Sequence, residues 1–101
     1  MDLWMKAVLL EKEVIANGNK IPVYGLAHFK VGPRYRDLGS YNLKAMELIA
    51  IADGKKCIVA FCDDKVLPFY NKCGWYVVGR KGKANIISSH PLVNIQVEEQ
   101  W

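Results

Sequence analysis

The sequence predicts one α/β (α+β) domain over residues 1–101, built on a mixed and mainly antiparallel sheet with a central βαβ unit and a short helix in the C-terminal half. Three observations support this fold class. The pair Asn17-Gly18 separates two strand-like runs, which is the strongest short-range signal of a β-hairpin. A helical stretch lies between two apolar runs of strand length, as in a βαβ unit. The chain is also long enough to bury one independent hydrophobic core.

The first hairpin is predicted over residues 3–16 and 21–30. Residues 3–15 alone fit a helix and a strand about equally well, because their apolar positions follow neither period strictly. The Asn17-Gly18 pair decides in favour of a strand. Side chains of the second strand are expected to alternate between two faces. One face holds Leu26, His28 and Lys30, and the other holds Ala27, Phe29 and Val31.

His28 in this second strand is a candidate general base. The reference pKa of histidine lies near physiological pH, so this side chain can collect a proton from an attacking amine. The other interpretation is a surface histidine or one that is hydrogen-bonded for structural reasons. The residues by themselves leave both interpretations open.

A turn that suits a phosphate group follows this strand. Gly32-Pro33 ends the strand, because proline lacks an N–H donor and keeps the preceding residue out of helical geometry. Arg36 and Gly39 then lead into a helix, whose first N–H groups have no intrahelical acceptor and lie at the positive end of the helix dipole. Lys30 and Arg34 add positive charge. The turn therefore predicts an anion site.

The helix after the turn is predicted to contain about fourteen residues and to end at Gly54, in the position that favours a left-handed cap. Four apolar residues at helical spacing are expected to face the core: Leu43, Met46, Ile49 and Ala50. Leu48, Ile51 and Ala52 widen this apolar face. The helix is therefore expected to be well buried against the sheet.

Residues 57–62 form a continuous apolar run, which is typical of a central strand covered on both faces. A right-handed crossover through the preceding helix places this strand parallel to residues 23–31. Asp63 or Asp64 is expected to cap a short helix that ends at Gly74.

Three segments complete the chain. Residues 75–78 are predicted to form a strand and residues 79–83 a basic, flexible loop. Val93, Ile95 and Val97 alternate with polar residues, which predicts a half-buried strand. The net charge of +4 would attract a polyanion, but no nucleic-acid-binding motif is present, so nucleic acid is a disfavoured partner.

The composition disfavours membrane, secreted and metal-binding proteins. No segment approaches the roughly 20 apolar residues of a membrane-spanning helix, and the first residues lack the pattern of a signal peptide. A cytoplasmic location without a membrane partner is therefore expected. Cys57, Cys62 and Cys73 are odd in number and lack metal-ligand spacing, so reduced, buried thiols are expected.

Two motifs follow one another along the middle of the chain. The first is Val-x-Pro-x-Tyr-Arg-x-x-Gly at residues 31–39, and the second is Phe-Tyr-Asn-Lys-Cys-Gly-Trp at residues 69–75. With the helix and the strand between them, they resemble the acyl-CoA-binding half of the GNAT superfamily of N-acyltransferases. The resemblance covers residues 24–78 and implies acetyl-CoA (coenzyme A) as the cofactor.

The resemblance also assigns site residues. The turn whose backbone amides wrap the coenzyme pyrophosphate corresponds to Arg36, Asp37, Leu38, Gly39, Ser40 and Tyr41. Tyr41 stands where the family prefers Gly or Ala. The pantetheine arm would run beside the strand that contains Phe29 and Val31. Tyr70 corresponds to a tyrosine that protonates the departing thiolate, and His28 is the second candidate catalytic residue.

The implied activity is transfer of an acyl group, in the first place acetyl, from acyl-CoA to an amine acceptor, either a small molecule or a peptide. The family has a strand and two helices ahead of the hairpin that find no counterpart here. One sheet edge is therefore expected to be open, which predicts a homodimer. A non-catalytic module that binds acyl-CoA or a protein is the alternative. A nucleic-acid-binding module ranks third, because the aromatic residues lie within predicted strands and helices.

Overall fold

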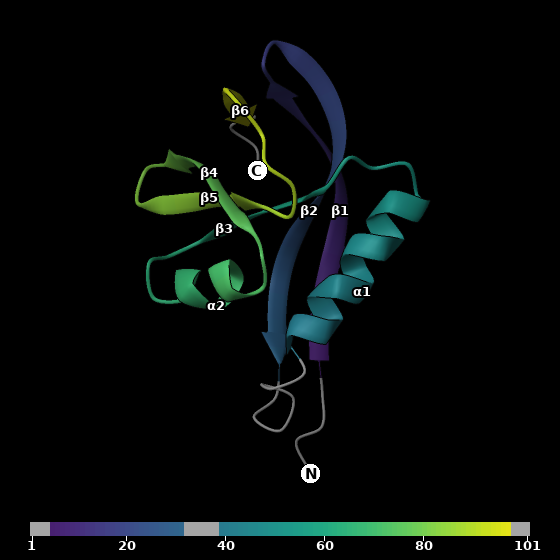
Figure 1. Ribbon diagram of the computed structural model, residues 1–101, viewed down its shortest axis with the longest axis vertical. Helices are drawn as coiled ribbons and strands as arrows, with labels where there is room; N and C mark the ends of the chain where they lie inside the picture. Colours follow the sequence, from purple (N-terminus) through teal and green to yellow (C-terminus); the bar gives the residue numbers. More distant parts are fainter. Residues whose placement is uncertain (1–4, 32–38, 98–101) are drawn as a thin grey trace.

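The computed structural model describes residues 5–31 and 39–97, which form a mixed α+β domain with a mostly antiparallel six-stranded sheet and two helices (Figure 1). The elements follow one another as β1 (Met5–Ala16), β2 (Asn19–Val31), α1 (Gly39–Ala52), β3 (Ile58–Cys62), α2 (Leu67–Lys72), β4 (Tyr76–Lys81), β5 (Ala84–Ser88) and β6 (Ile95–Val97). Neither of these two helices is long and apolar enough to cross a membrane.

The strands are ordered β4-β5-β3-β2-β1-β6 across the sheet. Within the described part of the chain, β2 and β3 are the one parallel pair, and α1 connects them. This arrangement confirms the predicted βαβ unit. The other neighbouring strands are antiparallel.

The N-terminal hairpin is also confirmed. β1 and β2 pair along their whole length, up to Ala16 opposite Asn19. Asn17 and Gly18 have φ angles of +51° and +81°, as the two-residue type I′ turn requires at both central positions. The second strand begins at Asn19 rather than at residue 21, and residues 3 and 4 lie outside the described part of the chain.

A β-bulge interrupts β2 near its C-terminal end. The register of the β1–β2 pair shifts between Lys6 and Val8, and His28 has a φ angle of +54°. An extra residue in one strand reverses the alternation of side chains beyond it. Leu26 and Phe29 consequently pack against the same core cluster. The predicted placement of Phe29 on the face opposite Leu26 is therefore wrong.

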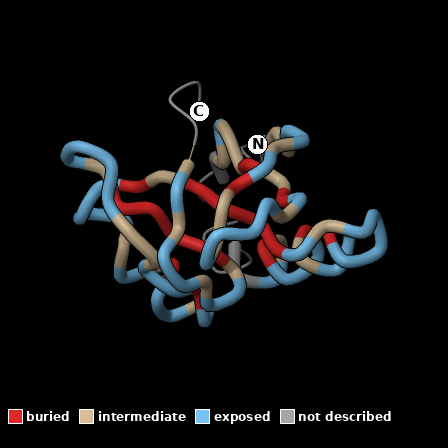
Figure 2. Tube along the Cα trace, turned by 90° about the horizontal axis from the view of Figure 1, so that it is seen from above, coloured by how far each residue is buried: buried red, intermediate tan, exposed pale blue. Residues whose placement is uncertain are grey.

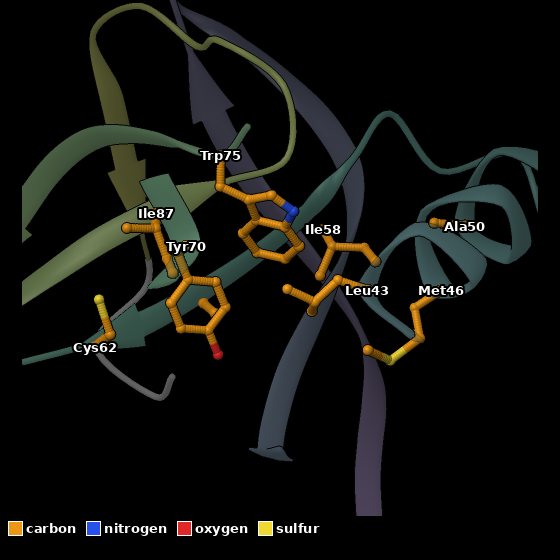
Figure 3. Close-up of a cluster of buried hydrophobic side chains, with 9 residues drawn as sticks. Leu43, Met46, Ala50, Ile58, Cys62, Tyr70, Trp75 and Ile87 are labelled. Carbon is orange, nitrogen blue, oxygen red and sulfur yellow. The ribbon is translucent and has the colours of Figure 1, made fainter. Parts of the chain in front are cut away.

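The sheet is covered on both faces, and each face carries its own core cluster. On the face covered by the helices, the buried side chains come from α1, β3, α2 and β5 and from Trp75 (Figure 3). On the other face, Val14, Val23 and Val59 pack beneath the C-terminal segment. Buried residues are concentrated in the central strands (Figure 2). β3 contributes to both clusters, as its continuous apolar run predicted.

Helix α1 has the predicted length of fourteen residues, and Gly54 with a φ angle of +78° follows its C-terminal end. Leu43 is completely buried, whereas Leu48 is 69% and Ile51 is 65% exposed. Ile49, which was expected to face the core, is 51% exposed. The expectations that Ile49 packs in the core and that the whole apolar surface of α1 is buried are therefore wrong. A helix lying on one face of a sheet buries a single stripe, and the apolar residues of α1 extend around its full circumference.

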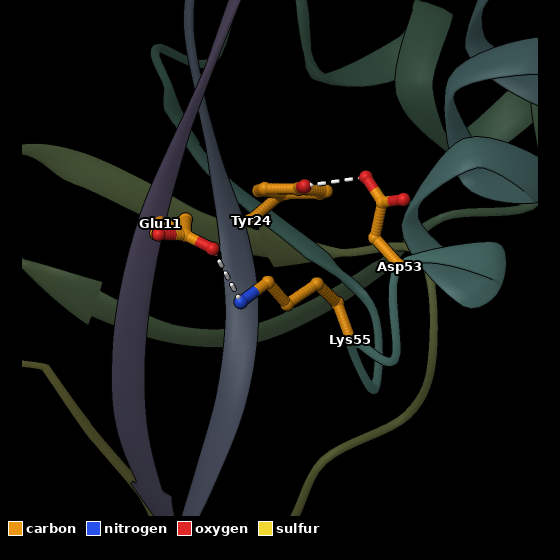
Figure 4. A network of polar contacts seen from close by, with 4 residues as sticks. All are labelled: Glu11, Tyr24, Asp53 and Lys55. Atoms are coloured by element: carbon orange, nitrogen blue, oxygen red, sulfur yellow. Dashed lines mark hydrogen bonds and ion pairs between the residues drawn. The ribbon is translucent and has the colours of Figure 1, made fainter.

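A polar network attaches the C-terminal end of α1 to the hairpin (Figure 4). The Tyr24 hydroxyl donates to Asp53 Oδ2 at 2.5 Å, and Lys55 Nζ donates to Glu11 Oε1 at 3.1 Å. Lys55 Nζ also lies 5.3 Å from the centroid of the Tyr24 ring. The hydrogen bond to Asp53 raises the pKa of Tyr24. Exposed contacts of this kind define the position of the helix more than they stabilise the fold.

The region predicted as a basic, flexible loop is a β-hairpin, so that prediction is wrong. Residues 79–81 belong to β4, and the turn at Gly82 leads directly into β5. β5 was not predicted as a strand, yet it lies in the sheet interior between β4 and β3. At the end of the chain, β6 is shorter than predicted, because Val93 precedes it and is 64% exposed.

The prediction that Asp63 or Asp64 caps the short helix is wrong, because the N-cap residue of α2 is Val66 and no side chain caps it. Asp63 instead stabilises the turn that precedes α2. Its Oδ1 atom accepts hydrogen bonds from the N–H groups of Lys65 at 3.0 Å and Val66 at 3.2 Å. Asp64 has a different role, since its Oδ1 atom accepts from the Asn85 side chain at 2.8 Å. The structure thus distinguishes two neighbouring carboxylates that the sequence left equivalent.

Candidate functional site

The two parallel strands at the centre of the sheet diverge. β2 and β3 pair at Tyr24 with Ile58 and at Gly25 with Val59. Beyond these positions, β2 continues along β1 while β3 continues along β5. On the facing sides of the two strands, the backbone groups past Gly25 and Val59 therefore have no ladder partner in the described sheet. Such groups need another hydrogen-bond partner, which is either water or a ligand.

A cavity of about 600 Å³ lies in this divergence. Its wall is formed by β2, β3, α2 and the turn before α2, through Leu26, His28, Phe29, Ala60, Phe61, Cys62, Asp63, Val66, Phe69 and Tyr70. Most of these side chains are apolar, and a few polar groups converge among them, which is typical of a ligand site. The cavity brings together three of the predicted site residues, namely His28, Phe29 and Tyr70.

Tyr70 projects from α2 into the core at the wall of the cavity. Its ring packs against Phe69 and Trp75, each with a centroid distance of 5.3 Å, and Figure 3 shows the hydroxyl pointing away from Trp75. This hydroxyl has no hydrogen-bond partner among the described residues. Burial, reinforced by the Cys62 and Cys73 thiols, raises the pKa of Tyr70 to about 12. Tyr70 therefore keeps its proton at neutral pH, and its hydroxyl can donate a hydrogen bond.

Cys62 lies at the wall of the cavity, in surroundings that favour the protonated thiol over the thiolate. Its thiol is free and its side chain is buried. Burial is the main cause that raises the pKa of Cys62, and the charges of Asp63 and Asp64 add to it. The surroundings thus disfavour a thiolate at this wall.

His28 also lines the cavity, in the bulge of β2, and its side chain is exposed. A positive φ angle is unfavourable for any residue with a Cβ atom. The bulge therefore costs stability locally, while it directs His28 and Phe29 to the rim of the same cavity.

The loss of folding stability caused by the positive φ angle at His28 can be measured by comparing two substitutions. His28→Gly should yield a protein that is more stable than His28→Ala by about 1 kcal/mol, because only glycine adopts a positive φ angle without a Cβ penalty. Urea unfolding gives both free energies. At His90, the exposed histidine without a positive φ angle, the order should reverse or vanish. Equal stabilities of the two His28 variants would contradict the bulge.

The predicted phosphate turn is only partly described. Arg36, Asp37 and Leu38 lie outside the described residues, so the structure places none of them. Val31 ends β2, and Gly39 and Ser40 open α1. The side chain of Tyr41 is 71% exposed and does not line the cavity. The first turn of α1 contains no acidic residue, so its N–H groups remain compatible with an anion.

Seven cavity residues were not predicted as site residues: Leu26, Ala60, Phe61, Cys62, Asp63, Val66 and Phe69. A signal for some of them was present. In α/β sheets, ligands bind beyond the carboxyl ends of parallel strands, and the predicted strand over residues 57–62 ends at this place. The side of the strand that would open was not predictable, because it depends on the placement of β5 beside β3.

Within residues 5–31 and 39–97, no group of three or more His, Cys, Asp and Glu side chains is arranged to hold a metal ion. Comparison with models of known protein families and with curated proteins gave no match to this chain. The function is therefore inferred from the cavity and the residues that line it.

Proposed function

We propose that this protein is an acyl-CoA-dependent N-acyltransferase of the GNAT type that transfers acetyl to an amine. One observation carries the proposal: the parallel strands β2 and β3 diverge around a cavity whose wall presents the protonated hydroxyl of Tyr70. The order of β2, α1, β3 and α2 along the chain supports the same assignment.

The open strands offer a place for the pantetheine arm of the coenzyme. This arm is extended and carries two amide groups, so it can pair with a strand edge as a peptide does in β-augmentation. The unpaired backbone of β2 beyond Gly25 provides such an edge. The pyrophosphate would then lie at the first turn of α1, where Gly39 and Ser40 present N–H groups at the positive end of the helix dipole.

The reaction proposed for this site is direct transfer. The neutral amine attacks the thioester carbonyl, a C–N bond forms, the C–S bond breaks, and the sulfur leaves as a thiolate. Tyr70 donates a hydrogen bond to this thiolate and shares its proton as the C–S bond breaks. The proton lost by the amine passes to His28 or to water. The low polarity that raises the pKa of Cys62 also favours protonation of the departing sulfur.

Calorimetric titration with acetyl-CoA tests the proposal, with ATP and dephospho-CoA as comparison ligands. We expect micromolar binding of acetyl-CoA and negligible binding of ATP, because only the pantetheine arm reaches the divergence of β2 and β3. Absence of acetyl-CoA binding at millimolar concentration would refute the proposal. Transfer is then assayed with a panel of amines through release of free thiol.

A module that binds acyl-CoA without turnover is the second candidate function. The hydrogen bonds that Asp63 already accepts favour this candidate. Asp63 is the carboxylate among the described cavity residues, and its Oδ1 atom already accepts two N–H groups. The base would then be the exposed His28 or a group outside the described residues. Acetyl-CoA binding without transfer to any amine of the panel would support this second function.

A bulky residue at the cavity wall should block the coenzyme. Val66 lines the cavity and is 46% exposed, so Val66→Trp should fill the space without disturbing the core. We expect acetyl-CoA affinity to fall at least about tenfold, equivalent to a loss of about 1.4 kcal/mol. Val93→Trp is the matched control at an exposed valine outside the cavity. Equal affinities in the two variants would mean that the coenzyme binds elsewhere.

A further inference from the structure

Helix α1 carries an apolar face that no described part of the chain covers. Leu43, Met46 and Ala50 form the buried stripe toward the sheet. On the opposite side, at 100° per residue, lies a second stripe with heptad spacing, made of four exposed residues: Tyr41, Ala45, Leu48 and Ala52. Figure 1 shows α1 along one flank of the molecule. We refer to these four residues and the adjacent Ile49 and Ile51 as the outer face.

The outer face exposes much more apolar surface than isolated surface residues do. Tyr41 is 71% exposed, Leu48 is 69%, Ile51 is 65% and Ile49 is 51%. Taking roughly 150–200 Å² for a whole large side chain, these four offer on the order of 450 Å² per molecule. This value is within the range of the largest patches on monomers, which commonly serve interactions.

We propose that the outer face of α1 binds the same face of a second copy of this chain, forming a symmetric antiparallel helix pair. The stripe alternates large and small residues with spacings of four, three and four. In an antiparallel pair, the positions with large residues on one helix lie opposite the positions with small residues on the other helix. Leu48 of one copy then faces Ala45 of the other, and Tyr41 faces Ala52. Every large side chain meets a small one, in both halves of the pair.

This pattern is self-complementary, and that property identifies the occupant as a second copy. In a two-fold interface, the same surface must fit itself, so each contact between two positions occurs twice. Antiparallel packing also brings the N-terminal end of each α1 beside the C-terminal end of its counterpart, which makes the two helix dipoles complementary. Lys44 flanks the seam, where its aliphatic stem covers Ile51 of the other copy.

The area of the two outer faces is close to what a dimer needs. Two faces of about 450 Å² offer about 900 Å² together, which is near the roughly 1,000 Å² expected of a specific interface. Interfaces at the small end of the specific range are typically weak, so we expect the dimer to form at micromolar and higher protein concentrations.

The open edge of β1 is a less suitable interface. β6 already pairs with Val14–Ala16 on that edge. Along the rest of β1, the charged residues Lys6, Glu11, Lys12 and Glu13 interrupt the apolar ones. Charged side chains on an edge strand oppose pairing with another edge. The uncharged seam of α1 has no such obstacle.

Sedimentation equilibrium over about 1–300 μM, without coenzyme, tests the dimer. The mass should rise from the monomer value of 11.4 kDa toward twice that value. Leu48→Glu places two carboxylates in the seam and should raise the dissociation constant at least about thirtyfold. Val93→Glu, at a similarly exposed valine away from α1, should leave the dissociation constant unchanged. A monomer throughout, or a dimer that tolerates Leu48→Glu, would overturn the proposal.

An exchange of residues tests the antiparallel register. Ala45→Leu alone should crowd Leu48 of the other copy, and Leu48→Ala alone should leave a gap, so each should weaken the dimer about tenfold. The double variant restores a large residue opposite a small one, and its dissociation constant should return to within about threefold of the original. Additive weakening would refute the pairing of positions 45 and 48. Because no coenzyme takes part, these outcomes are independent of the proposed acetyl transfer.

Discussion

Replacing Tyr70 by phenylalanine should lower kcat for acetyl transfer by about a hundredfold or more, with little change in acetyl-CoA affinity. The ring that packs against Phe69 and Trp75 is kept, and only the hydroxyl at the cavity wall is removed. General acid assistance typically contributes about 10²–10⁴ in rate. Steady-state kinetics and calorimetry on the same preparation separate the two effects.

Tyr76→Phe is the control for this prediction. Tyr76 lies on β4, is 47% exposed and does not line the cavity. Its loss of a hydroxyl should leave both kcat and affinity within about twofold of the original values. If Tyr70→Phe retains full turnover, Tyr70 takes no part in the reaction, and water must protonate the departing thiolate.

The same substitution should change the dependence of stability on alkaline pH. Tyr70 has a pKa of about 12 in the folded protein, compared with 10.0 for the free side chain. The folded state therefore binds this proton more tightly, and the resulting stability is complete below pH 10 and is lost as the pH rises toward 12. The loss amounts to about 3 kcal/mol. In Tyr70→Phe this loss should be absent, which urea unfolding between pH 8 and 12 can detect. Parallel curves for the two proteins would mean that Tyr70 is solvated.

Sequence patterns predicted the elements whose signals are local. The Asn17-Gly18 turn, the helix ending before Gly54 and the apolar central strand are each determined by neighbouring residues, and each is found where expected. The hairpin of β4 and β5 was missed because the basic residues around its turn are typical of a loop. Its second strand is identified only by burial between β4 and β3, which depends on distant parts of the chain.

The sequence indicated only some of the residues that line the cavity. His28 was a candidate because of its residue type and Tyr70 because of the family resemblance, and both line the cavity. The position of Phe29 on the same face as Leu26 could not be derived from strand alternation, because the bulge at His28 reverses that alternation. A bulge depends on the fit of two whole strands and has no strong signal at the bulged residue. The cavity itself arises from the divergence of strands, which is a property of the sheet and not of any segment.

Two leucines on α1 provide the sharpest test of how this helix lies on the sheet. Leu43 is completely buried and Leu48 is 69% exposed, although they are five residues apart on one helix. Leu43→Ala should cost about 2–5 kcal/mol of unfolding free energy, since it removes buried methyl groups and leaves a cavity. Leu48→Ala should change it by less than about 0.5 kcal/mol. Urea unfolding followed by tryptophan fluorescence at about 0.2 μM keeps the protein well below the concentration expected for the dimer. Comparable losses would mean that both sides of α1 are covered within one molecule, and this would remove the surface on which the proposed dimer depends.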